Sequence, residues 1–92
     1  MKQAFEQYLI RRGYSRRTPS GHPSTVYDYI GRIDRVCRWE QCTWEALAAR
    51  IDAAIADYGP GGSKEALGRR SHDAVISALA RFKEFTGDTQ AK

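Results

Sequence analysis

Arginine and lysine side chains fall into three groups along this chain, and cations grouped in this way bind anions. The groups are Arg11, Arg12, Arg16 and Arg17; Arg32, Arg35 and Arg38; and Lys64, Arg69 and Arg70. A DNA duplex presents a phosphate about every 1.7 Å along its axis, so a protein that binds it needs several cations on one surface. The groups therefore predict a polyanionic partner, and DNA is favoured over a membrane.

The third group comes directly before a predicted helix that is capped by Ser71. The first turn of a helix has free backbone N–H groups and a partial positive charge, which together bind phosphate. Arg69 and Arg70 are unfavourable beside that partial charge, but they suit a position that holds an anion. We expect DNA contacts from Lys64, Arg69, Arg70, Ser71 and His72, although an exposed histidine after a helix cap commonly has no role.

The second group recurs every three residues on the outer side of a predicted helix. Asp28 precedes Arg32 by four residues and Asp34 precedes Arg38 by four, so both arginines have a possible salt-bridge partner. Such a pair would stabilise the helix by a few tenths of a kcal/mol (about 0.3–0.5) and neutralise the arginine. Arg35 has no acid at that position, so it is the strongest DNA-binding candidate of the three, with Arg32 as a further candidate.

The first group extends into a segment rich in Ser, Thr, Pro and Gly, which we predict as a loop over residues 13–23. Arg16 and Arg17 lie within it. Both contact with DNA and plain solubilising charge remain open for these two residues.

Motifs for metal binding and catalysis are missing from the sequence. Cys37 and Cys42 lack the CxxC spacing of a zinc site, and no histidine stands at a matching distance. We interpret both as reduced thiols, with Cys37 in the core. Residues 59–64 contain Gly, Ser and Lys, but they follow a helix and lack the spacing of a phosphate-binding loop. We expect no metal, no cofactor, no small-molecule substrate and no enzymatic activity.

Charge is distributed unevenly around the formal net value of +4. Residues 1–38 hold eight Lys and Arg against three acids, residues 39–62 one against four, and residues 63–92 six against four. Basic ends and an acidic middle indicate a polyanion that touches only part of the surface. The acidic middle also supports a second hypothesis, in which a basic protein binds Glu40, Glu45, Asp52 and Asp57.

Apolar residues recur every three or four positions in four segments, and no segment alternates as a strand does. The predicted helices cover residues 2–12, 25–38, 43–58 and 71–86, and a helical turn is predicted at 63–67. Thr25 or the serine before it, Thr43 and Ser71 are the predicted N-caps. Trp39 and Trp44 lie on the inner faces, which favours core packing over base stacking.

Glycines and the chain ends complete this outline. Gly31 costs its helix about 1 kcal/mol relative to Ala, so we expect a close approach or a packing reason there. Gly87 ends the last helix, and residues 87–92 are expected to fray. No stretch reaches the roughly 20 apolar residues of a membrane span, and the start lacks the apolar run of a signal peptide. We predict one cytoplasmic domain over residues 1–92, with no membrane partner.

The order of large residues resembles the N-terminal core-binding domain of phage-type tyrosine recombinases, or integrases. The pattern is Thr25-x3-Tyr29-x3-Ile33-x2-Val36-x2-Trp39, then Trp44-x2-Leu47, then Ser77-Ala78-Leu79-x2-Phe82-x2-Phe85. Phe5 and Leu9 precede a Gly-x-Ser turn at residues 13–15, as in that family. About seven extra residues separate this turn from Thr25, which is a departure from the family. The resemblance covers about residues 5–86.

This resemblance implies an all-α fold, an orthogonal four-helix bundle of the SAM-like, integrase N-terminal type. It implies double-stranded DNA as the partner, with Thr25 and Ser71 near phosphates. The family's catalytic residues lie in a separate domain, so the chain would be a non-catalytic DNA-binding module of a site-specific recombinase that acts in DNA integration and recombination. The catalytic domain or other recombinase subunits would be further partners. A SAM-like domain that binds proteins without DNA is the alternative.

Overall fold

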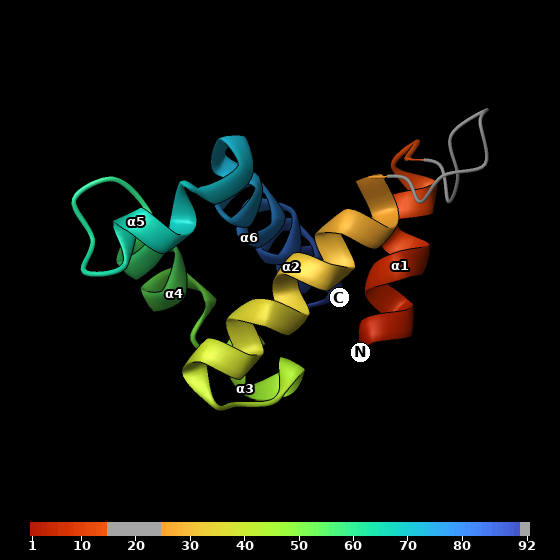
Figure 1. The fold of residues 1–92 in the computed structure, drawn as a ribbon. Helices are drawn as coiled ribbons and strands as arrows, with labels where there is room; N and C mark the ends of the chain where they lie inside the picture. Colours follow the sequence, from red (N-terminus) through yellow and green to blue (C-terminus); the bar gives the residue numbers. More distant parts are fainter. Residues whose placement is uncertain (15–24, 91–92) are drawn as a thin grey trace.

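The computed structural model describes residues 1–14 and 25–90, and for residues 25, 70–73 and 88–90 it describes the backbone alone. Within these residues the chain forms helices and no strand, which confirms the all-α prediction (Figure 1). The helices are α1 (Lys2–Arg11), α2 (Thr25–Glu40), α3 (Trp44–Ala49), α4 (Ile51–Tyr58), α5 (Glu65–Gly68) and α6 (Arg70–Gln90). Of the loop predicted over residues 13–23, the structure describes residues 13 and 14, and Arg16 and Arg17 lie outside the described residues.

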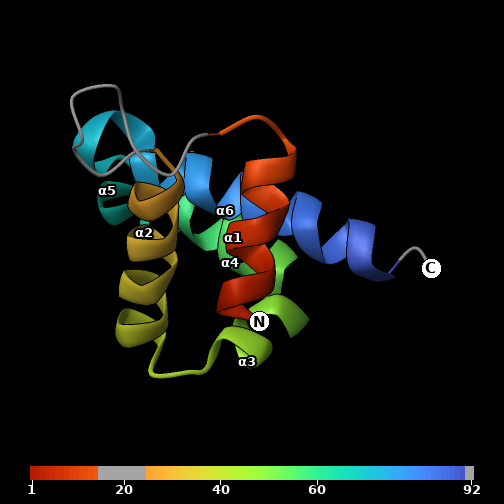
Figure 2. The same ribbon diagram turned by 90° about the vertical axis from the view of Figure 1, so that its right-hand side faces the viewer.

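Helix α6 is the element around which the others pack, because it contacts each of the other five. Figure 1 shows α1 at one end of the molecule and α4 with α5 at the other, with α2 and α6 between them. Figure 2 shows the start of α1 close to α3. There Phe5 packs its ring against Trp44, Phe82 and Phe85, with centroids 5.3–5.9 Å away. This aromatic cluster joins α1, α3 and α6 in one core.

Helix α1 buries the face that the sequence predicts. Phe5, Tyr8 and Leu9 are its buried residues, and they stand one turn apart. The helix ends where Gly13 takes a φ of +102°, a conformation that is strained for any residue with a Cβ.

Helix α2 continues to Glu40, two residues beyond the predicted end, and then stops in a Schellman motif. The Cys42 N–H donates to the Cys37 carbonyl (3.0 Å), and the Gln41 N–H donates to the Arg38 carbonyl (3.3 Å). Gln41 has a φ of +54° and occupies the left-handed position that such a turn needs. No glycine marks this end, so the sequence alone placed it too early.

The helix predicted over residues 43–58 is wrong as a single element, because it is divided at Arg50 into α3 and α4. Its predicted start is confirmed, since Thr43 Oγ1 accepts a hydrogen bond from the Ala46 N–H (3.0 Å). Leu47, Ile51 and Tyr58 are buried on both sides of the break and keep their three- and four-residue spacing. Periodicity reports which residues face the core, so it did not reveal the break.

The last helix also differs from its prediction at both ends. Arg69 keeps a right-handed helical conformation (φ −88°, ψ −2°) between α5 and α6, so α6 begins at Arg70 and Ser71 lies inside its first turn. The predicted N-cap at Ser71 is therefore wrong, because an N-cap lies outside the helix. At the other end α6 passes through Gly87 to Gln90. Phe85 and Thr86, directly before the glycine, are buried, so the core fixes the helix up to that point.

Two glycines near α5 have a steric reason that the sequence did not show. A Cβ on Gly68 would overlap the backbone carbonyl of Tyr58, and a Cβ on Gly62 would overlap the carbonyls of Ala56 and Asp57. Backbone atoms cannot move away as a flexible side chain can. The approach of α5 to the end of α4 therefore requires glycine at both positions.

We predict that Gly68→Ala lowers the free energy of unfolding by about 2–3 kcal/mol, because the new methyl group forces α5 away from α4. Urea denaturation followed by circular dichroism measures this change. Gly87→Ala is the matched control, since a Cβ there meets nothing within 4 Å. A Gly68→Ala protein as stable as the parent would contradict the packing described for α5.

Candidate nucleic-acid interface

The outer side of α2 carries a shallow depression of about 370 Å³ in the described surface. Its lining consists of one aromatic residue, one glycine and five charged residues, namely Tyr27, Asp28, Gly31, Arg32, Asp34, Arg35 and Arg38. All of them belong to α2. They lie together because residues three, four and seven positions apart share one face of a helix. The second group of arginines thus lies together, as predicted.

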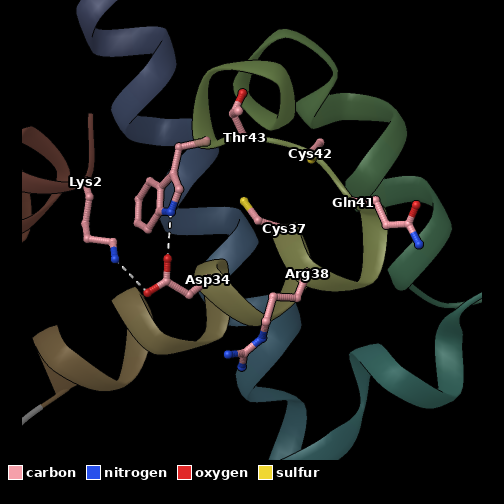
Figure 3. A pocket seen from close by; sticks show the side chains of 8 residues that line it. Lys2, Asp34, Cys37, Arg38, Gln41, Cys42 and Thr43 are labelled. Carbon is pink, nitrogen blue, oxygen red and sulfur yellow. Dashed lines mark hydrogen bonds and ion pairs between the residues drawn. The ribbon is translucent and has the colours of Figure 1, made fainter.

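Both aspartates of this depression have their own cation. Asp28 pairs with Arg32 at 3.6 Å, as the four-residue spacing predicts. Asp34 Oδ2 lies 2.9 Å from Lys2 Nζ, and its Oδ1 accepts a hydrogen bond of 2.8 Å from the indole N–H of Trp44 (Figure 3). The salt bridge of Asp34 therefore forms with Lys2 of α1 and not with Arg38.

The pKa of Asp34 is lowered from its ordinary value by this arrangement. Burial by itself raises it, but the hydrogen bonds from Lys2 and Trp44 and the charge of Lys2 outweigh burial. The carboxylate thus stays ionised and remains occupied by residues of α1 and α3.

Arg35 and Arg38 are exposed, and neither has an ion pair within the part of the chain that the structure describes. We call the surface formed by Tyr27, Gly31, Arg35 and Arg38 the α2 basic face. Arg32 contributes less to it, because its guanidinium is committed to Asp28 and its Nε is buried without a partner among the described residues. The positive charge of this face therefore comes from Arg35 and Arg38.

Tyr27 is a member of this face that the sequence analysis missed. The residue is 40% exposed, which is unusual for a large aromatic residue in the described part of this molecule. Tyr27 stands four residues before Gly31 and eight before Arg35, on the outer stripe of the helix. That spacing was the available signal.

The third predicted group is divided by the fold. Lys64 is bound to Glu40, a carboxylate only 5% exposed at the end of α2, so its charge is compensated. Arg69 is 67% exposed and lies 3.6 Å from Glu65. It borders a separate depression with Pro60, Ile76 and Ser77, away from the α2 basic face.

The remaining predicted residues lie where side chains are not described. For Thr25, Arg70, Ser71 and His72 the structure gives the backbone, as the first residues of α2 and α6. Arg16 and Arg17 fall outside the described residues altogether.

Glu40 is contacted by three side chains from later parts of the chain. Tyr58 donates its hydroxyl at 2.9 Å, Arg50 lies at 3.1 Å, and Lys64 is bound to the same carboxylate. The hydrogen bond from Lys64 lowers the pKa of Glu40 most, against the opposing effect of burial, and the bond from Tyr58 lowers it further. Burial and the same carboxylate raise the pKa of Tyr58.

The two cysteines and two tryptophans behave as the sequence predicts. Both thiols are free, Cys37 is buried, and its pKa is raised to about 12 by burial and by Cys42 beside it. No cluster of potential metal ligands occurs among the described residues. Trp39 stacks on Tyr58 (5.9 Å), and Trp44 packs in the aromatic cluster, so both serve the core.

Comparisons with models of protein families, with curated proteins and with solved structures found no match. None of the helices in the described part of the chain combines the length and the apolar character needed to cross a membrane.

We predict that Glu40→Gln removes a pH-dependent part of the stability. The pKa of Glu40 lies below its ordinary 4.5 in the folded protein, so its contribution is complete above about pH 4.5 and is lost as the pH falls through the lowered value. At pH 7 the variant should unfold with a free energy lower by about 1–3 kcal/mol, because Tyr58 loses its ionised acceptor.

Urea titrations between pH 7 and pH 3 test this, with Glu45→Gln as a control at an exposed acid. The difference between the parent and the Glu40→Gln protein should shrink as the solution becomes more acidic. A difference that stays constant over this range would contradict the role given to the Glu40 charge.

Proposed function

We propose that this chain binds double-stranded DNA without cleaving it, and that the α2 basic face is its contact with phosphates. The observation that carries the proposal is the unequal compensation of charge on that face. Asp28 and Asp34 each have a cation of their own, whereas Arg35 and Arg38 are exposed and have no ion pair in the described residues. An exposed pair of free guanidinium groups suits the phosphates of a duplex.

The resemblance to core-binding domains supports a more specific proposal. In this proposal the chain is a SAM-like module of a tyrosine recombinase that holds DNA while another domain cleaves it. The residues that carry the resemblance include buried core residues of α1, α2, α3 and α6, namely Phe5, Leu9, Ile33, Val36, Leu47, Leu79 and Phe82. A core built from these residues is compatible with the same fold, while the basic side chains outside it supply the binding.

Binding by this domain alone should be weak. Two free arginines neutralise few phosphates, so the dissociation constant for non-specific duplex is expected on the order of 10⁻⁴ to 10⁻⁶ M at physiological salt. Stable attachment then requires further contacts, either from the first and third basic groups or from a partner domain.

We predict that replacing Arg35 and Arg38 together by Gln weakens duplex binding roughly tenfold and lowers the logarithmic salt slope by about two, because two phosphate contacts are lost. Fluorescence anisotropy with a labelled duplex at several salt concentrations measures both quantities. Circular dichroism confirms that the variant stays helical.

The matched control is Arg81→Gln with Lys83→Gln, which removes the same charge from α6. Arg81 lies 2.8 Å from Glu84, and Lys83 lies 2.9 Å from Asp52, so these cations are already compensated. Equal losses from the two double variants would indicate diffuse attraction and no defined face. A parent protein that does not bind duplex at low salt would overturn the proposed function.

A further inference from the structure

Gly31 lies in the middle of α2, and no described residue explains it. It is exposed, and a Cβ built on it meets no atom within 4 Å. Its backbone is helical, so no left-handed conformation requires glycine there. Glycine in a helix interior is less stable than alanine. Gly62 and Gly68, by contrast, are required by neighbouring carbonyl groups.

The surroundings of Gly31 point to an external reason. It lies at the depression of the α2 basic face, between Tyr27 one turn before it and Arg35 one turn after it. The missing side chain leaves the helix backbone open at this point. An extended chain of atoms can therefore approach the helix more closely here than over any residue with a Cβ.

The charge around this opening selects the kind of chain. Five of the seven lining residues are charged, and the uncompensated charge belongs to Arg35 and Arg38. An apolar peptide segment would find little apolar surface to cover. A sugar–phosphate strand would find cations on one side of the glycine and the exposed Tyr27 on the other.

We propose that Gly31 is the contact site for one sugar–phosphate strand of a bound duplex. At this point the duplex comes closest to the protein. This inference rests on the proposed DNA-binding function and adds a steric requirement to it. Arg35 and Arg38 attract the strand through charge, whereas Gly31 admits it through the absence of a side chain. The two contributions differ in how they respond to salt, because only charged contacts release counterions.

The test is a size series at this position, Gly31→Ala and Gly31→Gln. In the free protein Gly31→Ala should raise Tm by roughly 4–8 °C, because alanine favours the helix and its methyl group meets nothing. Affinity for a labelled duplex should fall about threefold or more for Ala and further for Gln. The salt slope should stay unchanged, because neither substitution removes a charged side chain. A stabilised protein that binds more weakly is the expected result.

Gly87→Ala is the matched control, because Gly87 is also an exposed helical glycine whose Cβ would meet nothing within 4 Å. This variant should bind duplex as the parent does. If the parent binds duplex and both Gly31 variants bind it equally well, the proposed strand contact at Gly31 is wrong, while the proposed function stands. If the parent binds no duplex, both the proposed function and the strand contact at Gly31 are wrong. A Gly31→Ala protein that is less stable than the parent would show that Gly31 has an internal role, which also overturns the inference.

Discussion

The arrangement of the helices depends on the contacts made by the buried carboxylate of Glu40. It lies at the last residue of α2 and is contacted by Arg50 at the break between α3 and α4, by Tyr58 at the end of α4, and by Lys64 before α5. A nearly buried charge is costly unless it is paired and hydrogen-bonded. Elements that are far apart in the sequence are therefore held at one point. The close approach of Gly68 to the Tyr58 carbonyl keeps α5 beside the same point.

The pairing of buried and half-buried charges also decides which cations remain available. Lys64 is compensated by Glu40, and Lys2 is compensated by Asp34, which joins α1 to α2. Arg35 and Arg38 remain on the outer side of α2, where neither forms an ion pair with an acid of the described residues. A net charge of +4 spread over the whole surface would attract anions weakly and without direction. Internal compensation thus leaves two uncompensated cations side by side on one helix face.

Stability and binding place opposite demands on α2. Its inner side is well packed, with Val26, Ile33 and Val36 fully buried. Its outer side carries a glycine that weakens the helix and two exposed arginines that form no ion pair within the described part of the chain. Features that break local rules without an internal compensation are expected at functional sites. The core of the domain tolerates this, because α6 contacts all the other helices and the aromatic cluster around Phe5 joins three of them.

The sequence by itself determined the helical class, the buried faces and the local signals. The spacing of Phe5 with Leu9 and of Leu47 with Ile51 correctly predicted residues of the core, and the residue type of Thr43 correctly predicted the N-cap of α3. Both features depend only on residues within one or two helical turns. The tertiary structure alone decided the break at Arg50, the joining of α5 to α6 through Arg69, and the choice of Lys2 as the partner of Asp34. Asp34 pairs with Lys2, 32 residues away, although Arg38 is four residues away in the same helix. Helical periodicity records which side of a segment faces the core and which charges can pair within one helix, but a partner on another segment is settled only when folding brings the two segments together.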